Sequence, residues 1–289
     1  TYQDLSGNWW HVSTMVVNVK NNFERRIGIW PSGFDKDGVL YCNTAYGDYP
    51  HYLPNGKADH LQSRFTGWML LNYNKPVRVS STLGSCAPNL AVDEDIKTWW
   101  SAKSGNKGEW IESDLGEVST IRAIQVNYAD QDVDSAFLGK IPGTYHQYLL
   151  QVSDDGKAWK TLADKSANKT DVPHDYIELK TPVRGRYLRL TNIHMPTGKF
   201  AICGLRVFGN GNGKAPGAVK AFVPLRGDTD RRNIWMKWGL SDQAQGYTIY
   251  TGTAPDKLYT SIMVYGKNEY YFKLSLIHIS EPTRRRGIS

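Results

Sequence analysis

The apolar residues of this chain come in short runs in which apolar and polar side chains alternate. Residues 9–16, 121–128 and 202–209 are examples, and Gly, Pro, Asn and Asp separate such runs from one another. Alternation with a period of two residues is typical of strands that bury one face, and the separating residues favour turns. The pattern predicts an almost all-β protein, and the length of 289 residues is sufficient for two or three domains.

The charge pattern argues against a nucleic-acid partner, and the distribution of apolar residues argues against a membrane span. The net charge at pH 7 is +7, and Lys and Arg are scattered along the chain without forming a stripe. This is typical of a solvated surface and predicts no nucleic-acid partner. The chain has no run of about 18 apolar residues, so no membrane span is predicted either. Cys42, Cys86 and Cys203 cannot all pair, and their spacing is not that of metal ligands.

Residues 89–116 hold the most specific motif of the chain. An acidic, oxygen-rich turn with Asp93, Asp95 and Thr98 leads into two consecutive tryptophans, and an alternating strand then runs from Trp110 to a tight turn at Gly116. Later strand-like runs follow at residues 121–128, 148–159, 186–190 and 202–209. Together these segments resemble the discoidin domain, the coagulation factor type C fold that is used by family 32 carbohydrate-binding modules. For residues 73–209 the resemblance implies a jelly-roll β-sandwich of two packed antiparallel sheets.

The resemblance also implies a calcium ion at the acidic turn. In the family, Asp and Thr oxygens and backbone carbonyls hold calcium there, and Asp93, Asp95 and Thr98 match these positions. Calcium needs six to eight oxygen ligands, and the family closes the site with a Glu just before the final strand, where this chain has Gly204. Two interpretations stand at this point: a calcium site, or an Asx-type turn whose hydrogen bonds are satisfied internally.

A sugar site in such modules lies on loops at one end of the sandwich. The candidate loop is residues 129–146, with Phe137, Tyr145 and His146 as ligand-binding candidates. An aromatic platform suits the apolar face of a pyranose, so the expected partner is a glycan. The alternative is that this loop packs against a neighbouring part of the same protein.

Residues 1–72 resemble the last blade of the five-bladed propeller of family 43 glycoside hydrolases. A strand with Trp9 and Trp10 comes first, and a second strand with Arg25 leads into the turn from Asp35 to Gly38. The resemblance places Arg25 in the substrate pocket; the alternative is that Arg25 packs on an aromatic ring or pairs with Glu24. Asp35 and Asp37 lie on the turn, where Asp favours local hydrogen bonds, and are not assigned to catalysis.

The resemblance places the two catalytic carboxylates of these inverting enzymes on earlier blades. Residues 1–72 do not include those blades, so this fragment is expected to be inactive alone. The blade is expected to pack against the rest of the propeller.

Two further segments follow the discoidin-like part. Residues 214–273 come after a Gly- and Asn-rich linker and resemble an immunoglobulin-like fibronectin type III sandwich, about two strands short. Residues 274–289 break the strand pattern and resemble a translated sequencing adapter, which predicts an artefactual tail; the alternative is a genuine basic tail.

Three functional hypotheses follow from these resemblances. The first is the carbohydrate-binding C-terminal portion of a secreted, periplasmic or cell-surface glycoside hydrolase that acts on arabinose- or xylose-containing plant polysaccharide. The second is a non-catalytic adhesion or interaction protein. The third is a structural brace that binds no ligand.

Overall fold

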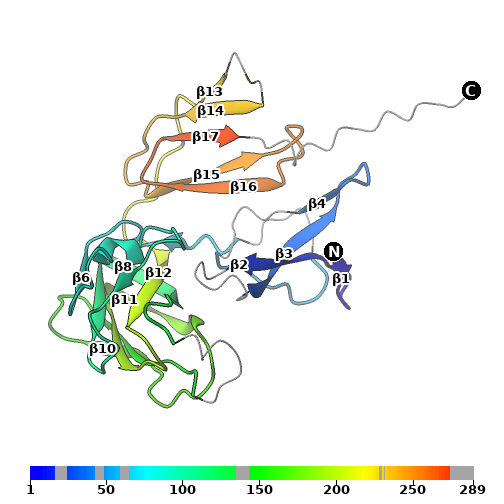
Figure 1. Ribbon diagram of the computed structural model, residues 1–289. Coiled ribbons are helices and arrows are strands. Elements are labelled where there is room, and N and C mark those ends of the chain that lie inside the picture. The colour runs from blue at the N-terminus through cyan, green and yellow to red at the C-terminus, as the bar shows by residue number, and fades with distance from the viewer. Residues whose placement is uncertain are drawn as a thin grey trace, which may run out of the picture. The chain divides into compact units, whose positions relative to one another are not determined.

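The computed structural model describes residues 1–16, 25–42, 49–58, 65–134, 143–227, 230 and 232–273. The chain divides into two compact units, Thr1–Asn212 and Gly213–Ser289. Strands make up nearly all of the regular structure in both units, which confirms the predicted all-β class (Figure 1). Among the described residues, no helix has the length and apolar character needed to cross a membrane.

The N-terminal segment forms a four-stranded antiparallel sheet in which the strands follow one another in chain order. Its strands are β1 (Tyr2–Gln3), β2 (Trp9–Val16), β3 (Arg25–Phe34) and β4 (Leu40–Cys42). The sequence pattern indicates three of these strands, and the structure adds β1. The turn before β2 is organised by Asp4, whose carboxylate accepts hydrogen bonds from the backbone of Ser6 and Asn8 and from the indole of Trp10.

The turn between β3 and β4 is held together by one carboxylate. Asp35 Oδ1 accepts hydrogen bonds from the backbone N–H groups of Asp37 and Val39, each at 2.9 Å. The N–H of Gly38 donates to the carbonyl of Asp35, and Gly38 has a φ of 73°, which favours glycine. Asp35 is thus a turn residue, as the sequence indicates.

The central part of the first unit is one continuous sheet of eight strands. The strand order is β10-β9-β11-β8-β12-β5, while β6 pairs with β8 and β7 pairs with β12. Its elements are β5 (Met69–Leu70), β6 (Val77–Val79), the short 3-10 helix η1 (Pro88–Ala91), β7 (Trp100–Ser101), β8 (Trp110–Tyr128), β9 (Gln147–Ser153), β10 (Lys160–Asp164), β11 (His174–His194) and β12 (Ala201–Asn210).

Two long strands, β8 and β11, fold this sheet into a sandwich because each belongs to both of its layers. The first part of β8 pairs with β6 and with the last part of β11, which also pairs with β9. The last part of β8 pairs with β12 and with the first part of β11. The register between β8 and β11 shifts between Glu178 and Val183 and again between Gly185 and Tyr187, and such bulges bend a strand. The predicted pair of packed antiparallel layers is therefore present.

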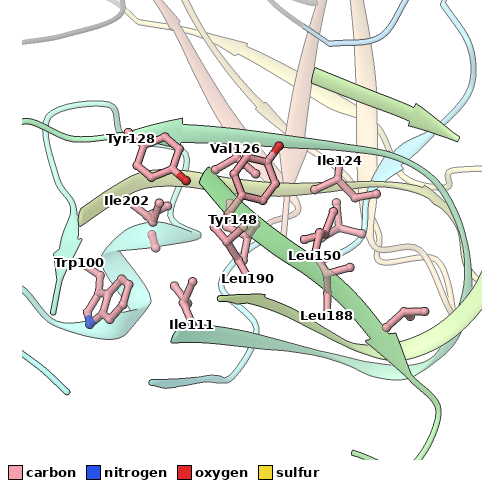
Figure 2. Close-up of a cluster of buried hydrophobic side chains, with 14 of the residues drawn as sticks. Trp100, Ile111, Ile124, Val126, Tyr128, Tyr148, Leu150, Leu188, Leu190 and Ile202 are labelled. Carbon is pink, nitrogen blue, oxygen red and sulfur yellow. The ribbon is translucent and has the colours of Figure 1, made fainter. Parts of the chain in front are cut away.

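The core lies between the two layers (Figure 2). Ile111, Leu150 and Leu188 come from one layer, and Ile124 and Val207 come from the other, and all are buried. Gly185 lies at the bend of β11, where a Cβ atom would come within 2.1 Å of the Val152 side chain. The bend thus requires a residue without a side chain.

One buried carboxylate ties three strands of the first layer together. Glu112 of β8 is 1 % exposed and accepts hydrogen bonds from Arg78 of β6 at 2.8 Å and from Arg189 of β11 at 2.7 Å. The Arg189 guanidinium also lies 4.1 Å from the centre of the Trp159 ring, which shields the ion pair from water. A buried charge of this kind is tolerated only while its partners are in place.

We expect Glu112→Ala to lower the free energy of unfolding by about 3 kcal/mol, because it leaves the guanidinium of Arg189 without its buried counter-charge. Urea denaturation followed by tryptophan fluorescence measures the change. Glu117→Ala, an exposed carboxylate on the same strand, is the control and should stay within about 0.5 kcal/mol of the parent protein. Equal effects of the two substitutions would contradict the assigned role of Glu112.

The C-terminal unit has two small antiparallel sheets with an apolar cluster that includes Met236, Trp238, Ile249 and Val264. Its strands are β13 (Val223–Arg226), β14 (Asn233–Lys237), β15 (Gly246–Thr251), β16 (Thr260–Tyr265) and β17 (Glu269–Lys273). The structure adds β17, which sequence reasoning missed. The predicted artefactual tail at residues 274–289 lies outside the described residues.

Candidate carbohydrate-binding site

The loops that follow β7, β8 and β11 meet at one end of the sandwich. The backbone of residue 199 donates to the carbonyl of residue 131, and the backbone of residue 200 donates to the carbonyl of residue 104. Gly198 makes this approach feasible: its φ is 73°, and a Cβ atom there would lie 2.5 Å from the carbonyl oxygen of Gln131. We refer to residues 129–134 and 194–199, with Tyr145, as the loop end.

A chain of polar contacts runs across the loop end. The indole N–H of Trp99 donates to Gln131 at 3.0 Å, and the amide of Gln131 donates to Asp132 at 2.7 Å. Asp132 in turn pairs with Lys199, with 3.1 Å between Oδ2 and Nζ. The side chain of Asp132 is 54 % exposed, so its carboxylate remains accessible to a ligand. Carboxylate and ammonium groups of this kind can hydrogen-bond the hydroxyl groups of a sugar.

Two ring side chains lie at the same end. The centres of the Tyr145 and His194 rings are 4.9 Å apart, with an angle of 39° between their planes. Both residues are half-buried. His194 is the last residue of β11 and leads directly into the loop that carries Lys199. The ring pair and the polar contacts therefore belong to the same group of loops.

His146, the neighbour of Tyr145, lies in a different environment. It is 9 % exposed and stacks on Tyr128, with 4.0 Å between the ring centres. Its Nδ1 atom has no hydrogen-bond partner among the residues that the structure describes. Burial, and then the nearby His174 and His194, lower the pKa of His146 to about 3. His146 is thus a buried, neutral ring that packs inside the sandwich and directly follows Tyr145 of the loop end in the chain.

Two other predicted site residues are described in part or not at all. Phe137 lies outside the described residues. Arg25 begins β3, where its backbone pairs with Val16, and its side chain is not among those described. Their proposed roles therefore remain predictions.

The acidic turn brings its three predicted residues together. Thr98 Oγ1 donates to Asp93 Oδ2 at 2.7 Å and lies 3.0 Å from the carbonyl of Asp95. Asp93 also accepts from the N–H of Asp95, and Asp95 accepts from the N–H of Lys97, each at 2.9 Å. These oxygens already have donors within the turn, and they are fewer than the six to eight that calcium needs.

The next carboxylate of the turn is already paired with a cation. Glu94 accepts two hydrogen bonds from the guanidinium of Arg206, at 2.9 and 3.0 Å, and one from the hydroxyl of Tyr49 at 2.9 Å. Arg206 lies two residues after Gly204 on β12 and is 5 % exposed. In the described part of the chain, no group of three or more His, Cys, Asp or Glu could hold a metal ion. The residues present do not fit a complete calcium site.

Asp132 lies in the loop that the sequence indicates, whereas sequence reasoning missed His194 and Lys199 as site residues. The turn-forming Pro196 and Gly198 mark a loop after β11, but nothing local indicates that this loop meets residues 129–134, more than 60 positions earlier.

Burial of His146 predicts a loss of stability in acid. The His146 ring takes up a proton near pH 6.5 in the unfolded chain and only near pH 3 in the folded chain. The free energy of unfolding therefore falls as the pH drops between these values. At about pH 5 burial of the His146 ring should lower the free energy of unfolding by about 2 kcal/mol. We expect His146→Phe, which keeps a ring against Tyr128, to reduce the difference between urea unfolding at about pH 7 and about pH 5. An unchanged pH difference would contradict this account.

Comparison with known proteins agrees with this architecture. Residues 76–204 match the family model of the F5/8 type C domain. No curated protein sequence matches the chain at a significant level.

Similar solved structures include three binding modules. Chitosan-binding module 1 from the chitosanase/glucanase of Paenibacillus sp. IK-5 has 22% identity over 49% of this chain and 99% of that chain, with a TM-score of 0.40. CpGH89CBM32-6 from Clostridium perfringens has 19% identity over 49% of this chain and 100% of that chain, with a TM-score of 0.39. The family 32 module of Clostridium perfringens NanJ, solved with galactose, has 17% identity over 46% and 92%, with a TM-score of 0.37.

The family model, the two layers joined by β8 and β11, and the motif at residues 89–116 agree with one another. The sequence resemblance is thereby confirmed for the central part of the chain: residues 76–204 form an F5/8 type C, discoidin-like domain.

Proposed function

We propose that the F5/8 type C domain binds carbohydrate at the loop end. The observation that carries the proposal is the Tyr145–His194 ring pair on the same group of loops as the Asp132–Lys199 pair, in which Asp132 is exposed. One face of a pyranose ring is apolar and packs on aromatic rings, while its hydroxyl groups need charged or polar partners. The loop end offers both kinds of group, and the sandwich below it holds the loops in place.

The charges of the loop end favour a neutral sugar over an acidic one. Asp132 and Lys199 have opposite charges and pair with each other, while Asp130 and Asp134 give the loop end an excess of negative charge. Each can exchange part of this exposed pairing for hydrogen bonds to hydroxyl groups at low cost, because an exposed ion pair contributes about 0–1 kcal/mol. The proposed ligand is thus an uncharged sugar or the end of a polysaccharide.

We propose further that this domain serves a secreted, periplasmic or cell-surface glycoside hydrolase acting on arabinose- or xylose-containing plant polysaccharide. Its support is the antiparallel sheet of β1 to β4 with the Asp35 turn, which fits the outline of a propeller blade. Arg25 is the residue proposed to reach substrate in that host. No catalytic pair is assigned in this chain.

A structural brace is the second candidate, and one contact favours it. The centre of the Tyr49 ring lies 5.5 Å from the centre of the Phe208 ring and 4.7 Å from Cζ of the Arg206 guanidinium. Tyr49 follows the N-terminal sheet in the chain, while Phe208 and Arg206 belong to β12. Through these contacts the sandwich can steady the N-terminal segment without binding a sugar.

Substitution at the ring pair tests the carbohydrate proposal. We expect Tyr145→Ala and His194→Ala each to weaken binding by roughly 5- to 10-fold, because a lost ring contact costs about 1 kcal/mol or more. Affinity electrophoresis on arabinoxylan and calorimetry with galactose and chitotriose provide the measurements. Galactose is the ligand named for the NanJ module, and chitotriose is the ligand named for chitosan-binding module 2 of the Paenibacillus sp. IK-5 enzyme. Tyr250→Ala, an exposed tyrosine of the other unit, is the control. Full binding by both ring variants, or no binding of any of these sugars by the parent protein, would refute the proposal.

We also propose that the acidic turn is closed by the Glu94–Arg206 pair in place of calcium. Calorimetry in calcium and in chelator should give the same melting temperature, because no ligand stabilises the folded state. Glu94→Gln should lower the melting temperature by several degrees under both conditions, since it leaves the buried guanidinium without its counter-charge. A calcium-dependent rise in melting temperature would overturn this proposal.

A further inference from the structure

A cavity lies on the outer face of the sandwich, and none of its described lining residues belongs to the loop end. Its volume is about 480 Å³, within the range of roughly 300–1,000 Å³ that is typical of small-molecule sites. One wall comes from β8 and β11, and the other comes from the segments around residues 50–53 and 66–68. All of these residues belong to the first compact unit.

The strand wall presents three side chains in register. Gln125 of β8 pairs directly with Tyr176 of β11, and Glu178 is two residues further along β11. Side chains two residues apart on a strand point to the same face, so Tyr176 and Glu178 lie side by side. Ile124 and Ile177, the alternate residues, contribute to the core on the other face. The cavity is therefore lined by the polar face of these strands.

The opposite wall is aromatic and is held by local contacts. Trp68 is 8 % exposed, and its ring centre lies 6.5 Å from that of Tyr52 in an edge-on arrangement. Thr66 donates to the carbonyl of Pro50 at 3.1 Å and accepts from the N–H of Trp68 at 3.2 Å, which joins the two segments of this wall. With Tyr176 across the cavity, three aromatic rings surround the space.

Among the described residues that line the cavity, Glu178 is the only one with a full charge at neutral pH. His51 also lines it, and burial lowers the pKa of that ring, so His51 adds no positive charge at neutral pH. Two guanidinium groups lie behind the walls. Arg206 is paired with Glu94 and donates to Gln125 at 2.6 Å, and Arg122 donates to Asn210 at 2.7 Å and lies 5.8 Å from the Trp68 ring.

Aromatic rings with a carboxylate beside them attract a cation, because the faces of the rings are electron-rich and the carboxylate supplies a counter-charge. The Gln125 amide and the Thr66 hydroxyl add groups that can hydrogen-bond neutral hydroxyls. We propose that this cavity is a second carbohydrate site, specific for a protonated amino sugar whose ammonium group pairs with Glu178. This site differs from the neutral-sugar site at the loop end and does not depend on it.

A comparison of three sugars that share the same pyranose ring separates the effect of ligand charge on binding from the effect of ligand shape. Calorimetry of the full chain with glucosamine, N-acetylglucosamine and glucose at about pH 6, where an amine is protonated, should give roughly three- to fivefold tighter binding of glucosamine, because Glu178 is exposed and an exposed ion pair contributes little. Glu178→Gln keeps the shape of the side chain and should reduce glucosamine binding to the level of glucose. Equal binding of the three sugars, no binding of glucosamine, or an undiminished preference in Glu178→Gln would each overturn the proposal.

Two further variants make the result specific to this cavity. Tyr52 is 59 % exposed, so Tyr52→Ala should remain folded and weaken glucosamine binding. Tyr145→Ala should bind glucosamine as the parent protein does, because Tyr145 belongs to the loop end. If Tyr145→Ala abolished glucosamine binding, the ligand would lie at the loop end and the cavity would not be its site.

Discussion

The pairing of β8 with β11 is the constraint on which the central domain depends. These two strands are the ones that run through both layers of the sandwich, so their register decides which side chains face the core and which face solvent. The bulges near Gly185 and Tyr187 turn the strands from one layer into the other, and Gly185 permits the close approach to Val152. The buried Glu112, held by Arg78 and Arg189, fixes the register at one end of this pairing.

Both proposed sugar sites follow from the same two strands. The loop end forms where β8 and β11 finish, because their last residues lead into the loops that Gly198 brings together. The cavity forms on the outer face, where Gln125 of β8 pairs with Tyr176 of β11. One strand pair thus supports two separate groups of polar and aromatic side chains, one on the loops and one in the cavity.

Much of the fold could be predicted from the sequence, because strand alternation and turn chemistry are local. The runs at residues 121–128 and 202–209 lie within β8 and β12, and Asp35 forms the expected turn. The sequence also indicates separate strands at 110–116 and 121–128, which the structure joins into β8, because partners far along the chain pair with both parts. The Asp132–Lys199 pair, the burial of His146 and the Glu94–Arg206 pair all depend on contacts of long sequence separation. No local pattern carries that information.

The most direct test of carbohydrate binding at the loop end is an amide chemical-shift titration of the full chain with galactose and with chitotriose. The account predicts that the amide signals of Tyr145, His194 and Lys199 change most with at least one of these sugars, while signals of β13 to β17 in the C-terminal unit stay in place. If neither sugar shifts any signal, or if the changes avoid the loop end, the central claim is contradicted.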